Sequence, residues 1–464
     1  PNWKQVNPFG MASINITCIA QDPNNNSVLY FGTGEAFGSM QVGSGIYKST
    51  DGGENWTILS NTAFTGPSSN FSYISKILVA SNSDIYATTK GYYCNVNGGL
   101  MKSTDGGASW TRVIGTNGTT CTNGTDLTGA DIEENSAGDL FFTSAGPSGH
   151  IYISNKSIHG NNVGNTGNWT DITPSGTWKN IEIGVSKQSG SGVIYAACQG
   201  SASYDVTGIY YSNSKGSSWT SRSIPTICDQ GNNSVFTRNQ AWYDLVVEID
   251  PSNDNIAYLG GIDLVKTADA GATFSQITTW SLYWPNPSCS GSTPPYLHAD
   301  QHALVFNPYT SNAALSGNDG GLSYSTNMNA SIPSWTSKNT GYNVTQYYAI
   351  ATHPSQKDYV LGGTQDNGSH KLSFYGIGSG SQISGGDGGF CHILQSNATY
   401  QTSSYVYNNF YVSSNSGSSF ISQSGSNSTT GRFVNPSELD DANALVFSAG
   451  NSNILEVPSG LTSG

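Results

Sequence analysis

Charged side chains, and basic ones above all, are scarce in this sequence. Only 10% of the 464 residues are charged, and 17 lysines and arginines face 30 aspartates and glutamates, which leaves a net charge of −13. Because phosphate backbones are bound through basic surfaces, this composition argues against nucleic acid as a partner. The chain also lacks a run of about 18 apolar residues, so we expect no membrane span. Neutral glycans, peptides and cations remain as candidate ligands.

Helical periodicity is missing as well. No long stretch repeats its apolar residues every 3.6 positions, whereas the chain contains 56 glycines and 11% aromatic residues. Glycine favours tight turns, and aromatic residues favour strands and the gaps between packed sheets. The composition therefore predicts an all-β protein made of many short strands.

A short motif, Ser-x-Asp-x-Gly-x-x-Trp, recurs along the chain and determines the expected architecture. The clearest copies are residues 49–56, 103–110 and 267–274; weaker or stretched copies begin at residues 154, 212, 325 and 413. The first six copies start 51 to 58 residues apart, which is the length of one four-stranded blade with its loops. We predict a β-propeller with six such blades up to about residue 340 and two or three shorter blades after it.

The motif has a structural role. Its Asp accepts hydrogen bonds from backbone N–H groups of its own turn, its Gly adopts a positive φ, and its aromatic residue packs between neighbouring sheets. These are the properties of an Asp box, the bacterial neuraminidase repeat. The Asp-box carboxylates are therefore not candidates for catalysis. Residues 1–345 form the Asp-box part, and residues 346–464 either continue the same ring or begin a second, incomplete propeller.

A second repeat places acidic residues on the opposite face. An apolar strand ends near a Pro, and an acidic residue follows after 11 or 12 positions, once a second strand has passed. In a four-stranded blade this acid lies in the loop between the second and third strands, whereas the Asp box lies between the third and fourth. Because antiparallel strands alternate in direction, the two sets of turns lie on opposite faces. The acids are Glu35, Asp263, Asp319 and Asp366.

Two loops that enter inner strands reach the same face. In the first, alternation along an extended chain points His298, Asp300 and His302 the same way. This row either binds a divalent cation, hydrogen-bonds a sugar, or forms a satisfied polar network without a ligand. The second loop places Asp387 between pairs of glycines, which lets backbone approach a ligand closely. Tyr347 also falls on this face.

Glu35 and Asp387 are the candidate catalytic pair. Glycoside hydrolysis needs two opposed carboxyl groups, one protonated and one ionised. As an enzyme, the protein would cleave internal bonds of a polysaccharide. As a binding module, the same face would hold a glycan, a peptide or a partner protein without turnover. No cofactor is required in either case, although a divalent cation fits the acidic face.

Four segments resemble those of bacterial sortilin-like glycosyl-hydrolase-related proteins. They are His298-Ala-Asp-Gln-His302-Ala-Leu, Gly317-Asn-Asp-Gly-Gly321, Gly363-Thr-Gln-Asp-Asn-Gly368 and Gly385-Gly-Asp-Gly-Gly389. The order of parts is also similar to that of two-propeller xyloglucan-hydrolysing glycosidases. That resemblance implies a catalytic role for Asp387, which matches their Gly-Asp-x-Gly-Gly-Phe site. Glu35 occupies roughly the position of their other catalytic residue, as Glu rather than Asp.

A sialidase is not expected, although Asp boxes are common in that class. Sialic acid is bound through a cluster of arginines, because the guanidinium group matches a carboxylate. This chain contains only Arg112, Arg222, Arg238 and Arg432.

The seven cysteines cannot all pair with one another. Cys94 and Cys121 lie in polar loops and are the predicted disulfide, and Cys228 and Cys289 are a second candidate pair. The remaining three, inside apolar strand patterns, are read as buried thiols: Cys18, Cys198 and Cys391. Together with the low charge and the resemblance, this predicts a secreted or cell-surface protein. A chain that begins at Pro1 is expected to be processed, and the strand-like residues 453–457 leave room for a continuation past Gly464.

Overall fold

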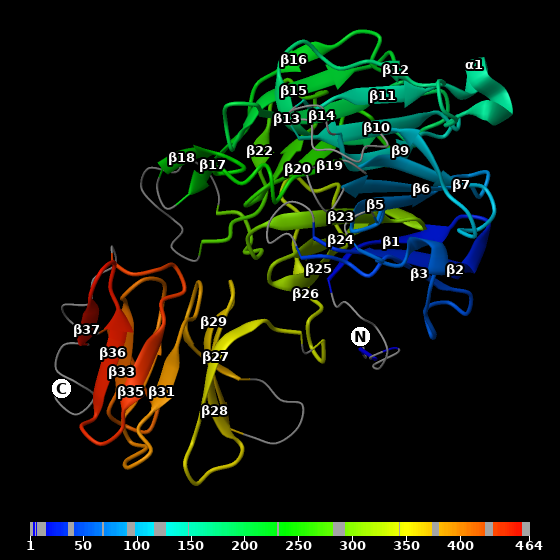
Figure 1. Ribbon diagram of the computed structural model, residues 1–464. Helices are drawn as coiled ribbons and strands as arrows, with labels where there is room; N and C mark the ends of the chain where they lie inside the picture. Colours follow the sequence, from blue (N-terminus) through cyan, green and yellow to red (C-terminus); the bar gives the residue numbers. More distant parts are fainter. Residues whose placement is uncertain are drawn as a thin grey trace. The chain divides into compact units, whose positions relative to one another are not determined.

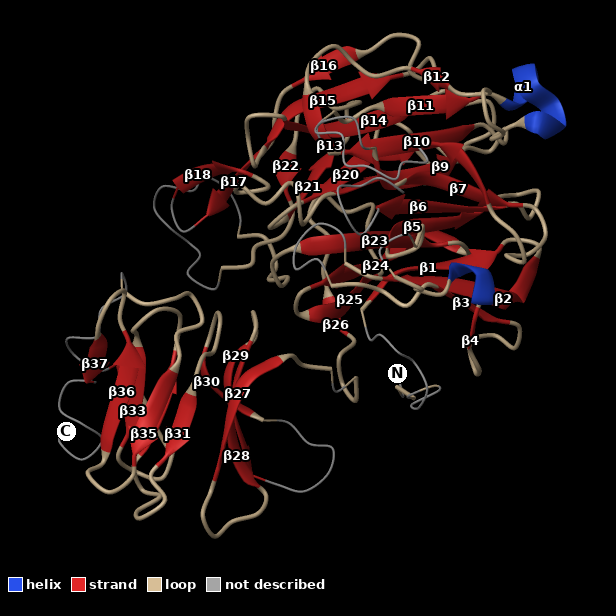
Figure 2. Ribbon diagram, viewed as in Figure 1, coloured by secondary structure: helices blue, strands red, loops and turns tan. Residues whose placement is uncertain are grey.

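The protein folds as two compact units in a computed structural model. The larger unit is residues 4–338, and the smaller unit is residues 339–464 together with residues 1–3. The structure describes residues 3–4, 6, 15–35, 41–66, 69–90, 98–115, 127–146, 148–229, 232–281, 293–342, 344–373, 380–422 and 430–456. Strands dominate both units, and the short helix α1 (Lys156–His159) lies at the edge of the larger one (Figure 2).

The described part of the larger unit contains six four-stranded antiparallel sheets, each made of strands consecutive in sequence. The first three sheets are β1 (Ile16–Asp22), β2 (Asn25–Thr33), β3 (Ile46–Ser49) and β4 (Thr57–Ile58); β5 (Tyr73–Val79), β6 (Ile85–Lys90), β7 (Gly99–Ser103) and β8 (Thr111–Ile114); and β9 (Thr128–Glu134), β10 (Leu140–Ala145), β11 (Ile151–Ser154) and β12 (Thr170–Asp171). The next three are β13 (Trp178–Val185), β14 (Ile194–Gly200), β15 (Val206–Ser212) and β16 (Thr220–Arg222); β19 (Val246–Ile249), β20 (Ala257–Gly260), β21 (Leu264–Thr267) and β22 (Ser275–Gln276); and β23 (Gln301–Asn307), β24 (Thr310–Asn318), β25 (Gly321–Ser325) and β26 (Thr336–Ser337). A two-stranded hairpin and two short 3-10 turns complete it: β17 (Thr226–Asp229), β18 (Asn232–Val235), η1 (Ser60–Thr62) and η2 (Gly160–Asn162).

The described part of the smaller unit contains three further sheets. They are β27 (Tyr347–Thr352), β28 (Tyr359–Thr364), β29 (Gly368–Ser373) and β30 (Ser381–Ser384); β31 (Cys391–Ile393), β32 (Gln401–Ser404), β33 (Phe410–Ser413) and β34 (Ile421–Ser422); and the three-stranded β35 (Ser437–Asp440), β36 (Leu445–Ala449) and β37 (Ile454–Glu456). Whether these sheets belong to a second ring stays a prediction.

The sheets are the blades of a β-propeller, as the repeats predicted. In the larger unit they follow one another along the chain from β1 to β26 (Figure 1). First strands of successive sheets lie side by side, β1 with β5, β5 with β9, β9 with β13, β13 with β19 and β19 with β23. A cavity of about 800 Å³ is lined by residues of these inner strands. The first strand of each blade is therefore the innermost one.

The repeated turn joins the third and fourth strands of a blade. After β3, Asp51 accepts hydrogen bonds from Asn55 N at 2.9 Å and Ser49 Oγ at 2.8 Å, and Trp56 Nε1 donates to Gly53 O. The same carboxylate-to-backbone bond recurs at Asp105 and Asp269. Hydrogen bonds from Asn55, then Ser49, lower the pKa of Asp51 to about 2. These carboxylates stabilise turns, which agrees with the structural role expected of them.

Removing the turn carboxylate should weaken the fold in a pH-dependent way. Hydrogen bonds from Ser109, then Ser103, lower the pKa of Asp105 to about 2, so its contribution is present above the unfolded pKa and is lost as the pH falls towards about 2. Asp105→Ala should lower the urea midpoint at neutral pH and lose this effect in acid. Ser214, which takes the place of Asp in its own copy, is neutral, so Ser214→Ala should give a smaller shift that does not change with pH. Urea unfolding at several pH values would contradict the idea if both variants behaved alike.

The inner strands share an irregularity near the face that carries the second repeat. A register shift near the start of β1, β5, β13, β23 and β27 leaves one residue without a direct partner. In β23 this residue is His302, between Gln301 and Ala303, and in β27 it is Tyr348. A β-bulge interrupts the regular alternation of side chains along a strand. The side chains at these positions therefore point in directions that simple alternation does not predict.

Buried residues between adjacent sheets form the core. Between the first two blades they include Ile46, Ile74 and Ile85, all at most 1% exposed. Cys198 and Cys391 are buried free thiols, as expected, and Cys18 is a half-buried one. Cys228 is disulfide-bonded. Among the described residues, no helix has the length and hydropathy needed to cross a bilayer.

Candidate functional site

The strand bounds place the predicted site residues in two kinds of loop. Glu35, Asp263, Asp319 and Asp366 follow the second strands β2, β20, β24 and β28, respectively. Asp300 precedes the inner strand β23, and Asp387 precedes the inner strand β31. The first three acids and Asp300 belong to the larger unit, whereas Asp366 and Asp387 belong to the smaller one.

Asp263 does not face a ligand. Its side chain is completely buried and accepts hydrogen bonds from Gln276 Nε2 at 3.1 Å and Thr278 Oγ1 at 3.2 Å. Both donors belong to the outer edge of the same blade, so the carboxylate fixes its own loop. The expectation that Asp263 lines the binding face is wrong, because burial against its own blade removes it from solvent.

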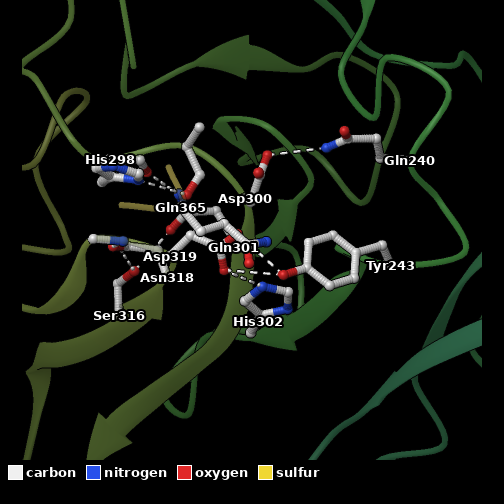
Figure 3. Close-up of polar contacts among 12 residues, drawn as sticks. Gln240, Tyr243, His298, Asp300, Gln301, His302, Ser316, Asn318, Asp319 and Gln365 are labelled. Carbon is white, nitrogen blue, oxygen red and sulfur yellow. Dashed lines mark hydrogen bonds and ion pairs between the residues drawn. The ribbon is translucent and has the colours of Figure 1, made fainter. Parts of the chain in front are cut away.

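In the larger unit, Asp319 is the centre of a polar cluster. His302 Nε2 lies 2.7 Å from Asp319 Oδ1, and the Tyr243 hydroxyl donates to Asp319 Oδ2 at 3.0 Å (Figure 3). The Tyr243 ring also packs edge-on against the His302 imidazole, with 4.7 Å between ring centroids. A carboxylate oxygen of Asp300 lies within 4.8 Å of one of Asp319.

The two carboxyl groups of this cluster titrate differently. Burial, followed by the charge of Asp319, raises the pKa of Asp300 to about 6, although His302 and His298 oppose the shift. Burial also acts on Asp319, but the hydrogen bond and charge of His302 and the hydroxyl of Tyr243 outweigh it and lower its pKa. Near neutral pH, Asp319 is ionised while Asp300 retains part of its proton.

The predicted row of His298, Asp300 and His302 is not a regular extended segment. β23 begins only at Gln301, and Asp300 has a left-handed φ of 63°. The simple alternation expected for these three residues is therefore wrong, because a positive φ and the bulge at His302 interrupt it. Asp300 Oδ1 instead accepts a hydrogen bond from Gln240 Nε2 at 3.0 Å. The His298 ring packs over Gly320, where a Cβ would clash with it.

Sequence reasoning missed the contribution of residues 240–244 to this cluster. This segment precedes the inner strand β19, just as His298 and Asp300 precede β23. It supplies Gln240 to Asp300 and Tyr243 to Asp319. Two signals were available: the aromatic residues Trp242 and Tyr243, which could stack on a sugar ring, and the position of the segment before an inner strand, where the two motif-bearing loops also lie.

Glu35 lies in the loop between β2 and β3 of the larger unit. Its backbone N–H donates to Gln41 O at 2.9 Å, and its side chain is half-buried. The preceding residue, Gly34, has a φ of 97° and is packed so closely that a Cβ would collide with Ser72 O. Glu35 is near Lys90, whose pKa is lowered by burial and raised again in part by the Glu35 charge.

In the smaller unit, Asp387 is held by two loops packed backbone to backbone. Its Oδ1 accepts a hydrogen bond from Asp366 N at 3.1 Å. Gly388 N donates to Thr364 O at 2.8 Å, and a Cβ at Gly363 would collide with the carbonyl of Gly389. The glycines flanking Asp387 therefore serve this close approach between two protein segments.

Tyrosines surround the Asp387 carboxylate. Burial, and then the charges of Asp387 and Asp366, raises the pKa of Tyr348 to about 12. Tyr405 packs its ring against Gly386, and its pKa is raised by burial and by Asp387. Tyr348, at the bulge of β27, lies near both Asp366 and Asp387. The predicted Tyr347 is 41% exposed, with its ring over Gly362.

A charged cluster lines the axial cavity of the larger unit, and the motifs gave no sign of it. Lys76 Nζ lies 2.9 Å from Asp131 Oδ1 and 3.6 Å from Glu133 Oε1. Lys187 Nζ lies 2.5 Å from Glu133 Oε2. A usable signal did exist, since each inner strand from β5 to β19 carries at least one charged residue.

Glu182 on β13 and Glu248 on β19 complete this cluster. Burial, then the charge of Glu133, raises the pKa of Glu248 to about 8 against the opposing effect of Lys187 and Lys76. Burial, then the charge of Asp131, raises the pKa of Glu182 well above its usual value. Among the described residues of the cavity region, four acidic groups face two lysines, so the acids outnumber the basic groups by two.

Cys94, Cys121 and Cys289 lie outside the described residues, so the predicted Cys94–Cys121 bridge stays a prediction.

Comparison with known proteins shows a likeness in fold. No protein-family model matches the sequence, and no curated protein matches it. Among solved structures, the GH74 enzyme of Niastella koreensis matches over 97% of this chain and 66% of its own, with 17% identity and a TM-score of 0.60. An ancestral GH74 enzyme matches over 96% and 62%, with 16% identity and a TM-score of 0.57. The chain thus spans less than two-thirds of either neighbour, and at this identity the likeness establishes the propeller fold alone.

Proposed function

We propose that this protein is a glycan-directed propeller that hydrolyses internal bonds of a neutral polysaccharide, with Asp387 as one reacting carboxyl group. The observation that carries the proposal is the setting of Asp387. A backbone N–H fixes its carboxylate, glycines hold its loop, and Tyr348 and Tyr405 lie beside it. An aromatic side chain can pack against the face of a sugar ring, while a fixed carboxylate next to it can react at the anomeric carbon of that sugar.

Glu35 is proposed as the second carboxyl group, as the sequence predicts. It belongs to the larger unit, so the pair is a proposal about residues of both units. Two carboxyl groups about 5–10 Å apart would fit this chemistry, the shorter separations giving retention and the longer ones inversion. Lys90 lies near Glu35, and the Glu35 charge raises the pKa of Lys90 against the larger effect of burial.

Non-catalytic binding is the second candidate function. It is favoured by the residue at position 35, a Glu where the resembling glycosidases have Asp. In this case the exposed ring of Tyr347 and the tyrosines beside Asp387 would hold a glycan without cleaving it.

An assay of new reducing ends separates the two functions. The purified chain is incubated with xyloglucan, mixed-linkage glucan, mannan and a charged polysaccharide as a control, and affinity electrophoresis on the same panel measures binding. We expect new reducing ends with at least one neutral polysaccharide. Binding without new reducing ends would support the binding module in place of the enzyme. If the protein neither cleaved nor bound any polysaccharide of the panel, a glycan-directed function would be contradicted.

We also propose that the protein is secreted or displayed at the cell surface. The bonded Cys228 supports this, because stable disulfides form in oxidising compartments. Intact mass measured before and after reduction, on protein collected from the medium, would show the bridge as a gain of two hydrogens. An unchanged mass would argue against this compartment.

A further inference from the structure

Three side chains of the third blade form a hydrogen-bonded row that the proposed hydrolase does not use. Ser148 Oγ lies 2.8 Å from His150 Nε2, and His150 Nδ1 lies 2.8 Å from Asp171 Oδ2. Ser148 and His150 belong to the loop between β10 and β11, and Asp171 ends the neighbouring β12 (Figure 1). This loop joins the second and third strands of its blade, as the loops of Glu35 and Asp319 do, so it lies on the same face of the propeller.

The Asp171 carboxylate determines which imidazole nitrogen carries the proton. Burial opposes the charged form of Asp171, but hydrogen bonds from the Thr173 hydroxyl and N–H, together with the charge of His150, outweigh it and lower the pKa of Asp171. An ionised carboxylate can only accept a hydrogen bond, so Nδ1 of His150 donates to it. In the neutral ring Nε2 is then the acceptor, and the hydroxyl of Ser148 donates its proton to this base.

The backbone around His150 is held in place by hydrogen bonds within the protein. Ser144 N donates to His150 O at 2.9 Å, and His150 N donates to Ser144 Oγ at 3.0 Å. Gly149 N donates to Trp178 O, in the first strand of the next blade, at 2.7 Å. The side chain of Ser148 is exposed. A substrate can therefore reach a hydroxyl whose base is already oriented.

We propose that Ser148, His150 and Asp171 form an esterase site that removes short acyl groups from the hydroxyls of a polysaccharide. A serine hydroxyl next to a base, with the base oriented by a carboxylate, is the arrangement in which serine acts as a nucleophile. Ser148 and His150 are the catalytic residues, and Asp171 is a positioning residue that acts through His150. An ester suits this site better than an amide, because an alcohol leaves more readily than an amine does.

The reaction needs only these groups and water. Ser148 Oγ bonds to the carbonyl carbon of the ester while its proton passes to His150 Nε2. The bond between this carbon and the sugar oxygen then breaks, and His150 gives the proton to the leaving oxygen. A water molecule next gives a proton to His150 Nε2 and attacks the acyl-serine ester. The carboxylic acid leaves, and the proton returns from His150 to Ser148 Oγ.

The polysaccharide part of this proposal rests on the glycan-directed function proposed above, whereas the ester chemistry does not. An exposed aromatic ring next to the loop supports it. Gly146 N, in the same loop, donates to Lys179 O at 2.8 Å. Lys179 Nζ lies 5.3 Å from the centroid of the Tyr204 ring, and Tyr204 is 60% exposed. A sugar ring can pack against an aromatic face of this kind.

Ester hydrolysis by the full chain tests the three residues. The protein is assayed with 4-nitrophenyl acetate and labelled with an alkyl fluorophosphonate, and the labelled peptide is identified by mass spectrometry. We expect the label on Ser148, and we expect Ser148→Ala and His150→Ala each to lower kcat/KM by at least about a hundredfold. Asp171→Asn should lower kcat by at least about tenfold and keep KM within a few-fold, because the orientation of the base acts on the transition state rather than on binding.

His159→Ala is the matched control. His159 is an imidazole of the same blade, at the end of α1, and an imidazole can hydrolyse 4-nitrophenyl acetate without the help of a serine. This variant should keep the rate of hydrolysis and the label on Ser148. Circular dichroism and Tm confirm that every variant is folded, and the label on Ser148 reports on nucleophilicity, which a structural role of the row would not provide.

Three results would overturn the esterase site. They are a folded wild-type protein without hydrolysis or label, hydrolysis that persists in Ser148→Ala, and a label on another residue. Acetate release from acetylated mannan tests the substrate separately. Release by the wild type but not by Ser148→Ala would support the polysaccharide ester, whereas hydrolysis of 4-nitrophenyl acetate alone would overturn it. Acetate release without new reducing ends would support this site and contradict the hydrolase.

Discussion

Asp387→Asn should lower polysaccharide hydrolysis by roughly a thousandfold, because an amide can neither take nor give a proton nor form a glycosyl ester. The substitution preserves the size of the side chain and the oxygen that accepts the hydrogen bond from Asp366 N. The glycine-rich loops should therefore keep their arrangement, and polysaccharide binding should stay within a few-fold of the wild type. New reducing ends and affinity electrophoresis measure the two quantities separately.

Asp358→Asn is the control for this experiment. Asp358 belongs to the same unit but precedes β28, in the loop that joins the first and second strands of its blade. Loops of this kind lie on the opposite face from the loops that carry Asp387. This variant should keep full activity, and Glu35→Gln should lose activity as Asp387→Asn does. Wild-type turnover in Asp387→Asn would remove Asp387 from the chemistry, and activity loss in Asp387→Asn alone would remove Glu35 from the pair.

The fold could be predicted from the sequence because one turn motif repeats along the chain. Each Ser-x-Asp-x-Gly-x-x-Trp copy needs a carboxylate, a glycine and an aromatic residue at fixed spacing, and a substitution such as Ser214 leaves the rest of the copy recognisable. The spacing then gives the blade length, and strand alternation gives the face on which each loop lies. The strand bounds place Glu35, Asp319 and Asp366 in the loops expected for them.

Individual side-chain directions were less accessible, because they depend on single backbone irregularities. The left-handed φ of Asp300 and the bulge at His302 overturn an alternation rule that holds only for extended chain. Tyr348, at the bulge of β27, lies near Asp387, and burial followed by the charge of Asp387 raises the pKa of this tyrosine.

The axial cavity should make stability depend on pH, and Glu248 is the group to test. Its pKa is raised to about 8, first by burial and then by Glu133. A raised folded-state pKa means that the favourable neutral form contributes fully below the unfolded pKa of about 4.3, and that this contribution is lost as the pH rises towards about 8. Glutamine imitates the protonated form at every pH. Glu248→Gln should therefore match the wild type near pH 4 and exceed its free energy of unfolding by about 1–3 kcal/mol at pH 9.

Glu133→Gln, in the same cavity, should act in the opposite direction. Burial alone would raise the pKa of Glu133, but Lys187 and Lys76 outweigh it and lower the pKa, so the charged form is the favourable one. Its loss would leave Lys187 without its carboxylate partner, 2.5 Å away, and should destabilise the protein at neutral pH by about 1–3 kcal/mol. Urea unfolding of both variants between pH 4 and pH 9 measures the two signs. If Glu248→Gln destabilised the protein at pH 9, the Glu248 carboxylate would have to be paired with Lys187 or Lys76, and the cavity would carry no uncompensated charge at that position.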